Sequence, residues 1–222
     1  MASPYFRYVP NFEYVNRLKE NKNISAYIQV KNLFKRGVLR EDILQDLSYF
    51  TKYKIVGDDR PDNVAYKVYS NQYYDWVVLL SNNIINYANE WPLSNQSFNN
   101  YLYSKYLNDA TLNAVKYYET LEVKDSLGKT IVPAGLQVPS DYSIRYIDSG
   151  SGKSVTASSV KAVTNYEYEV KVDEDKRNIY LLKEKYLGII ENDIDGDLLY
   201  QSGSSQYLSP TLVRGENIRL YS

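Results

Sequence analysis

The spacing of apolar residues changes along the chain, and each spacing predicts a different kind of element. Residues 53–56 alternate, with Tyr53 and Ile55 on one side, and this period of two predicts a short strand. Apolar residues three and four positions apart then predict short helices with one apolar face each. These helices are expected over residues 61–69, 73–82 and 94–106, the last with Ser94 as its N-cap. Between the second and the third helix, residues 90–93 are expected to form a short returning strand.

From about residue 115 the period is two, which predicts strands in place of helices. Strands are expected on both sides of a turn at residues 125–129, and again over residues 141–148, 165–172 and 178–182. Residues 165–172 show the alternation most clearly, because polar residues separate Tyr166, Tyr168, Val170 and Val172. A loop is expected at residues 149–159, a final helix at 183–194, and a polar tail after that helix.

The first 50 residues show little sign of a core of their own. Pro4 and Pro10 are expected to exclude a helix between them, because proline restricts the backbone before it and lacks an N–H group. Residues 23–37 are expected to be extended, and residues 40–50 to contain a short helix. Apolar segments of this kind usually become ordered against a partner. An arm is therefore predicted that is mobile in the free protein and wraps a neighbouring protein.

Aromatic side chains supply the candidate contact residues. Trp76 lies within an apolar run of the second helix and is expected to be part of the core, whereas Trp91 is assigned either to the core or to an interface. Tyrosine, with its large apolar ring and polar tip, suits surfaces that are buried on assembly. The candidate interface residues are Phe6, Tyr8, Phe12, Tyr14 and Trp91.

The composition excludes several kinds of chemistry. The 222 residues include 26 basic and 27 acidic ones, so the net charge of −1 predicts no general affinity for nucleic acid. Without histidine or cysteine, the chain has no disulfide, no thiolate metal ligand and no Ser-His-Asp triad. Its 25 tyrosines point to surfaces buried on assembly or to an AT-rich genome. The excess of basic residues in residues 1–40 is either a contact for an acidic surface or a solvated face.

Two short motifs suggest ligand binding but do not fit their full patterns. GSGKS, at 150–154, has Ile147 where a phosphate-binding loop needs its first glycine, and a plain loop is preferred. DIDGD, at 193–197, places Leu198 where a calcium loop needs glycine. No apolar run reaches the roughly 20 residues that span a bilayer, and the N-terminus lacks a signal-peptide pattern. The sequence therefore predicts no enzyme, cofactor, metal site, membrane contact or small-molecule substrate.

The stretch YKIVGDDRPDNVAYKVYSNQYYDWVVLLSNNI resembles a LysM module, which packs two short helices on a two-stranded sheet. The usual ending of that module, a glycine turn followed by an apolar strand and proline, is replaced here by IINYANEWPL. The resemblance implies an α+β fold with a LysM-like core plus a following helix at residues 51–110. An extended N-terminal arm over residues 1–50 precedes it and a β-rich C-terminal region over 111–222 follows it. It also leaves a peptidoglycan- or glycan-binding module as an alternative function.

The same stretch, continued to WPLSNQSFNNYL, is also similar to the gene product 53 family of baseplate wedge subunits from T-even-like contractile-tail phages. The residues that carry this likeness include Arg60-Pro61, Ala65, Tyr69, Trp76-Val77-Val78-Leu79-Leu80, Asn82-Asn83 and Trp91. KNLFKRG, NYEYEVKVDEDKRNIYLL and RGENIRLYS extend it over most of the chain. It implies a structural virion protein of the tail baseplate with no catalytic residues. Its implied partners are other wedge subunits and neighbouring wedges, which it helps to join into a ring around the hub.

Overall fold

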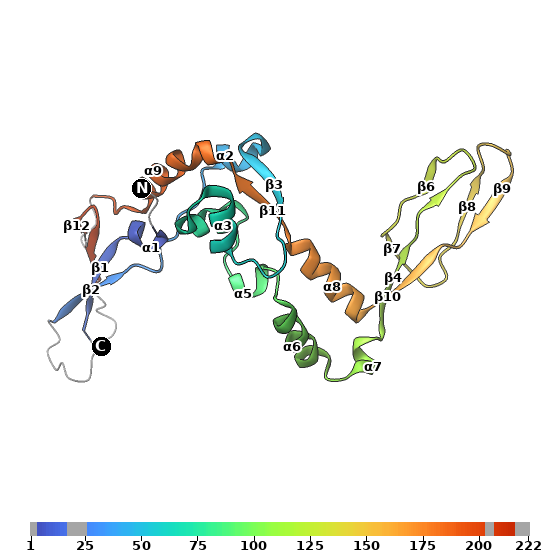
Figure 1. Cartoon of the computed structure of the whole chain (residues 1–222), viewed down its shortest axis with the longest axis horizontal. Coiled ribbons are helices and arrows are strands. Elements are labelled where there is room, and N and C mark those ends of the chain that lie inside the picture. Colours follow the sequence, from blue (N-terminus) through green and yellow to red (C-terminus); the bar gives the residue numbers. More distant parts are fainter. Residues whose placement is uncertain (1–3, 17–25, 203–206, 216–222) are drawn as a thin grey trace. The chain divides into compact units, whose positions relative to one another are not determined.

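The computed structural model describes residues 4–16, 26–202 and 207–215, and its fold is mixed α+β (Figure 1). The chain divides into two compact units. One, which we call the composite unit, contains residues 1–90 and 178–222; the other, the inserted unit, contains residues 91–177. The boundaries therefore fall elsewhere than at residues 50 and 110, because the last part of the chain returns to the unit that its first part builds.

The centre of the composite unit is a two-stranded sheet with two helices. Strand β3 (Phe50–Lys54) pairs antiparallel with β11 (Asn178–Leu182), and the helices are α3 (Pro61–Tyr69) and α4 (Asp75–Ser81), with the 3-10 turn η2 (Gln72–Tyr74) between them (Figure 1). The predicted helices and the strand at 178–182 are confirmed, and the first strand lies slightly earlier than predicted. The buried side chains here include Ile55, Val64, Ala65, Tyr69, Trp76, Val77, Val78, Leu80, Ile179, Leu181 and Leu182.

Local sequence signals set the ends of α3. Pro61 occupies the first helical turn, where its missing N–H costs nothing, and Ser70 ends the helix in the left-handed region with φ 57°. The Tyr69 hydroxyl then donates to the carbonyl oxygen of Leu182 at 2.8 Å, which ties the helix to β11. Burial raises the pKa of this phenol well above its ordinary value, so the hydroxyl stays protonated.

The two ends of the chain share one sheet. Its strands are β1 (Asn11–Val15), β2 (Tyr27–Lys31), β12 (Tyr207–Ser209) and β13 (Leu212–Arg214), in the order β12-β13-β1-β2. Strand β1 pairs parallel with β13 and antiparallel with β2. The predicted N-terminal arm is therefore paired with its own chain at β1, which lies between β13 and β2. The expected polar tail contains the strands β12 and β13. Residues 17–25, which belong to the predicted arm, lie outside the described residues.

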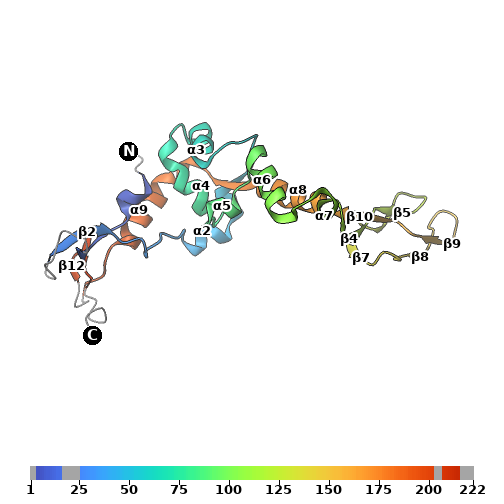
Figure 2. The same ribbon diagram turned by 90° about the horizontal axis from the view of Figure 1, so that it is seen from below.

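A short helix also stands where two prolines were expected to exclude one. Helix α1 (Tyr5–Tyr8) begins directly after Pro4, which occupies its N-cap position, and ends two residues before Pro10. Neither proline lies inside the helix, so neither removes one of its hydrogen bonds. Figures 1 and 2 both show α1 beside α9 (Leu187–Leu198), the predicted final helix, which follows the 3-10 turn η3 (Glu184–Tyr186).

Two further helices complete the composite unit. Helix α2 (Glu41–Gln45) precedes the 3-10 turn η1 (Leu47–Tyr49), in agreement with the predicted short helix, and α5 (Tyr87–Glu90) follows α4. The returning strand predicted at residues 90–93 is wrong, since α5 ends at Glu90 and the next residues form no strand. Among the described residues, no helix is both long and apolar enough to cross a membrane.

The inserted unit joins a helical part to small sheets. Its helices are α6 (Asn95–Tyr106), α7 (Asp109–Leu112) and α8 (Asn165–Lys176). Strand β4 (Val115–Thr120) lies between β10 (Val160–Thr164) and β7 (Gln137–Val138). Two hairpins are built from β5 (Val123–Lys124) with β6 (Thr130–Val132) and from β8 (Ile144–Ile147) with β9 (Ser154–Ala157). Part of the loop expected at 149–159 is thus the strand β9.

Helix α8 replaces the strand predicted at residues 165–172, and that prediction is wrong. Thr164 caps the helix: its side chain accepts from the Glu167 backbone N–H, while the Glu167 side chain accepts from the Thr164 backbone N–H. Four-residue spacing also places Glu169 and Asp173 on one buried side of the helix. An alternating run of tyrosine and charged residues is compatible with both elements, and here the cap and these buried carboxylates favour the helix.

Candidate interaction surfaces

The aromatic residues of α1 point in different directions. The Phe6 side chain is 59% exposed. Tyr5 and Tyr8 instead contact Trp76 of α4, with ring centroids 6.2 and 5.7 Å away. The Tyr8 hydroxyl also donates to Glu191 Oε1 at 3.3 Å. Of the two candidate residues in this helix, Phe6 is therefore the one available to a partner, and Tyr8 holds the segment to its own unit.

Phe12 and Tyr14 lie on one face of the sheet that the two chain ends share. They are two residues apart on β1, and their rings meet edge to face with centroids 5.8 Å apart. Their partners in register are Val30 and Ile28 of β2, so the whole face is apolar. Phe12 and Tyr14 are half-buried, while Ile28 is 40% exposed. The face is thus only partly covered by the described residues, and β2 forms one edge of the sheet.

Trp91 is a core residue of the inserted unit in this structure. Trp91 is 2% exposed, in agreement with the first of the two interpretations left open by the sequence. A side chain buried to this degree offers no area to a partner unless the unit opens. The structure therefore brings Phe12 and Tyr14 together but places Trp91 in another unit.

The most exposed pair of adjacent apolar residues in the described part of the chain was not among the predicted contact residues. Leu33 and Phe34 follow β2 in a tight turn, and their side chains are 71% and 94% exposed. Asn32 shapes the turn: its Oδ1 accepts from the Phe34 N–H at 3.1 Å, and its carbonyl accepts from the Lys35 N–H at 3.2 Å. The signal in the sequence was an apolar pair between an asparagine and basic residues. We call Leu33 and Phe34 the apolar knob.

The turn that carries the apolar knob is fastened to the end of α9. Lys35 Nζ donates to the carbonyl oxygens of Leu198 and Leu199 at 2.9 and 2.7 Å and lies 4.6 Å from the Tyr200 ring centroid. These carbonyls lack helical partners at the C-terminal end of the helix, where a cation is favourable. Asn32 Nδ2 donates to the Tyr200 hydroxyl at 2.9 Å. The knob thus projects from a turn that is fixed on both sides.

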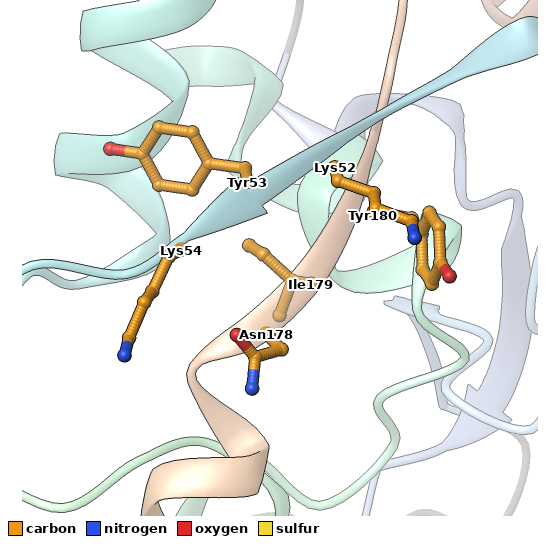
Figure 3. Close-up of a pocket in the computed structure, with 6 residues that line it drawn as sticks. All are labelled: Lys52, Tyr53, Lys54, Asn178, Ile179 and Tyr180. Atoms are coloured by element: carbon orange, nitrogen blue, oxygen red, sulfur yellow. The ribbon is translucent and has the colours of Figure 1, made fainter. Parts of the chain in front are cut away.

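A shallow, open depression of about 390 Å³ lies on the β3–β11 ribbon (Figure 3). The residues that line it are Lys52, Tyr53, Lys54, Asn178, Ile179 and Tyr180. Tyr53 is in register with Ile179, and Tyr180 with Lys52, so the two tyrosines point to opposite sides of the ribbon. The rings therefore do not converge on one ligand, and the depression lacks the enclosed apolar walls of a small-molecule site.

The buried carboxylate of the inserted unit is fully engaged by neighbours. Glu169 is 4% exposed and accepts from Tyr101, Lys105 and Tyr106 of α6 at 3.0, 2.8 and 2.6 Å. Burial alone would raise the pKa of Glu169, but these donors outweigh it and hold that pKa below its ordinary value. Burial and the bond to Glu169 raise the pKa of Tyr106 to about 12. The cluster ties α6 to α8.

A second buried carboxylate, Asp148, ties the two hairpins of the inserted unit together. Asp148, at the end of β8, accepts from the Ser126 N–H and hydroxyl at 2.7 and 2.8 Å and from the Ser151 N–H at 2.8 Å. The hydrogen bonds from Ser126 and Ser151 hold the pKa of Asp148 well below its ordinary range. Within the described ranges, no three acidic residues gather closely enough to hold a metal ion. These carboxylates therefore organise the chain itself.

Comparison with known families shows where the chain belongs. The model of one family, base plate wedge protein 53, matches residues 5–125. The chain belongs to this family. The match covers more than half of the 222 residues and includes α1, β1, β2, the apolar knob and the α3–α4 pair. No curated protein matches the chain at a significant level.

Membership of the base plate wedge protein 53 family makes this chain a structural protein of the bacteriophage tail baseplate. The predicted family is thereby confirmed. A wedge protein acts by contacting other baseplate proteins, so its functional residues are those that a partner can reach. In the matched region, the apolar knob and Phe6 meet that condition, while Tyr8 and Trp76 serve the internal packing of the composite unit.

Proposed function

We propose that this protein joins neighbouring wedge subunits to one another and helps to connect wedges into a ring around the tail hub. It does so without catalysis and without a cofactor. The observation that carries the proposal is the combination of family membership with exposed apolar side chains on anchored segments. A monomer gains nothing from a nearly fully exposed phenylalanine on a fixed turn, whereas an assembling subunit gains binding energy from it.

Several segments of the composite unit contribute to this role. Phe6 extends from α1, while Phe12 and Tyr14 belong to the partly covered face of the shared sheet. Because parts of both chain ends pair with each other in that sheet, a partner bound to this face would contact both ends at once. In the inserted unit, the hairpin residues Leu127 and Ile147 are 72% and 70% exposed and offer a separate contact region.

The arrangement of β3, α3, α4 and β11 supports the interpretation of a LysM-like core. Two short helices accompany a two-stranded antiparallel sheet, as in that module, but the second strand follows only after the whole inserted unit. The same arrangement favours one alternative function, the binding of peptidoglycan or another glycan. Against it stands the depression on this ribbon, whose tyrosines face opposite sides and form no joint platform for a sugar.

Co-expression separates these functions. The full chain is expressed with the other wedge proteins of the same phage, and the complexes are analysed by native mass spectrometry. We expect the chain in a defined complex with at least one wedge protein, and no binding to insoluble peptidoglycan in a pull-down. Binding to peptidoglycan together with failure to enter any wedge complex would overturn the proposal in favour of the glycan-binding alternative.

A further inference from the structure

We propose that the apolar knob, Leu33 and Phe34, inserts into an apolar pocket on a neighbouring wedge protein, and that acidic side chains surround this pocket. The inference rests on the proposed function, since it names the contact through which this chain would join its neighbours. It begins from exposure. Phe34, at 94%, is the most exposed large apolar side chain in the described part of the chain, and Leu33 is beside it at 71%.

The knob is held ready for binding by its own chain. Asn32 accepts from the Phe34 N–H and donates to Tyr200, and its own N–H donates to the Pro10 carbonyl at 2.9 Å. Lys35, on the other side of the pair, is bonded to the last carbonyls of α9. A partner therefore pays little conformational entropy to order this turn, which is the condition under which a few apolar side chains dominate an interface.

Charge around the knob indicates the chemistry of the partner. Lys31, Lys35 and Arg36 flank the pair, and no acidic residue stands between residues 31 and 36. Among the described residues, their side chains donate to neutral oxygens: Lys31 to the Val9 carbonyl, Lys35 to the end of α9, and Arg36 to Asn83 Oδ1 at 3.2 Å. Nearby Arg40, by contrast, is paired with Asp42 and Asp193.

Three positive charges that have no carboxylate partner in the described part of the chain therefore flank two apolar side chains. Carboxylates at the rim of the receiving pocket would complement these charges, speed association and exclude basic surfaces. Nucleic acid is the less favoured occupant, because Leu33 provides no stacking surface and Lys35 is engaged by the end of α9. The observations thus favour a protein partner with an acid-rimmed apolar pocket.

The test uses the full-length chain and the complex of the remaining wedge proteins of the same phage, purified without this chain. Affinity is measured by biolayer interferometry for the wild type, Phe34→Ala and Leu33→Ala, and thermal unfolding is recorded for each. We expect Phe34→Ala to weaken binding by about thirtyfold or more, as hot-spot truncations do, with an unchanged melting temperature. Leu107→Ala, which is 85% exposed in the inserted unit, is the matched control and should leave this affinity within about twofold.

The charges are tested in the same assay. Arg36→Ala should lower the association rate and reduce its dependence on salt, since a rim charge acts mainly on encounter. A single-stranded oligonucleotide is included as a second ligand. If Phe34→Ala and Leu33→Ala both bind the wedge proteins as tightly as the wild type does, the inference is overturned while the proposed function stands. Loss of oligonucleotide binding in Phe34→Ala, with wedge binding intact, would overturn it in favour of nucleic acid. Failure of the wild type to bind the wedge proteins would overturn the proposed function and the inference together.

Discussion

The side chain of Asn82 pairs with the backbone of Tyr180 as a neighbouring strand would. Asn82 Nδ2 donates to the Tyr180 carbonyl at 2.8 Å, and the Tyr180 N–H donates to Asn82 Oδ1 at 2.8 Å. A residue directly after α4 thereby covers part of the outer edge of β11. Asn82 Nδ2 also donates to the Val78 carbonyl at 2.8 Å. One side chain therefore binds a carbonyl in the last turn of α4 and the backbone groups at the edge of β11.

Replacing this amide should weaken the composite unit. Asn82→Ala removes three hydrogen bonds worth about 0.5–1.5 kcal/mol each, so we expect the free energy of unfolding to fall by roughly 1.5–4.5 kcal/mol. The measurement is urea unfolding of the full chain, followed by circular dichroism. Asn100→Ala, an exposed position on α6, is the control and should change stability by less than about 0.5 kcal/mol. An unchanged midpoint for Asn82→Ala would show that water replaces the amide without cost.

Trp76 joins the N-terminal segment to α4, and its removal should affect both. The ring is 4% exposed and contacts Tyr5 and Tyr8. We expect Trp76→Ala to destabilise the protein by about 3–5 kcal/mol, as loss of a large buried aromatic residue does. Amide hydrogen exchange in residues 5–15 should also become faster than in the wild type. Tyr73→Ala, at a 47% exposed position, is the control; equal melting temperatures for both variants would contradict the core assignment.

The buried cluster of the inserted unit should make stability depend on pH at both extremes. The pKa of Glu169 is lower in the folded state than its ordinary 4.5, so its contribution is present above that value and is lost as pH falls through the folded pKa. Hydrogen bonds from Lys105 to Glu169 and Tyr101 raise the pKa of Lys105 above its ordinary 10.5. That contribution is present below 10.5 and is lost as pH rises through the folded pKa.

Glu169→Gln tests this relationship. The amide keeps the shape but loses the charge, so we expect a loss of roughly 1–3 kcal/mol at neutral pH, where both charges are present. The difference in stability between wild type and variant should be constant between about pH 4.5 and 10.5 and should shrink outside this window. Thermal unfolding of both proteins across the pH range gives the measurement. A difference that stays constant at low pH would show that the carboxylate charge does not act through this cluster.

Two glycines should respond to alanine in opposite directions. A methyl group at Gly150 would collide with Ser126 Oγ, at the contact between the two hairpins, so Gly150→Ala should cost about 1–3 kcal/mol. Gly188 lies inside α9 with no atom near the position of a new methyl group, and Gly188→Ala should stabilise by about 0.4–1 kcal/mol. Paired unfolding curves check both signs, and a stabilising Gly150→Ala would contradict the contact between the hairpins.

Local signals were enough for the elements that depend on few neighbours. Proline at the start of α3, apolar residues at helical spacing and the Ser94 cap of α6 all act within one or two turns of backbone, so the sequence predicted these helices. The family was likewise predicted from residues 60–91 and their surroundings. Signals of this kind lie in residues that are close together in the sequence. Tertiary contacts are therefore not needed to choose between a helix and a strand.

Pairing between distant segments was decided only in the folded chain. Nothing in residues 11–15 specifies that β13 will pair with them. Likewise, nothing in β11 specifies that it will pair with β3, which lies before the whole inserted unit in the sequence. For residues 165–172, the alternation fitted a strand, but Tyr101 and Tyr106 supply donors to Glu169 only if that segment is helical. Long-range hydrogen bonds of this kind override a local period because they satisfy a buried charge.

The interaction surface shows the same division. The sequence by itself determined that Leu33 and Phe34 are apolar, that basic residues flank them, and that Asn32 can form a turn. Whether the pair is buried depends on where the turn is held. The position of the turn is set by the hydrogen bonds of Asn32 and Lys35 to the end of α9 and Tyr200, more than 160 residues later in the chain. The physical reason is that exposure belongs to a position in space: α9 offers unpaired carbonyls that bind Lys35, and with the lysine fixed there, Phe34 is left in solvent.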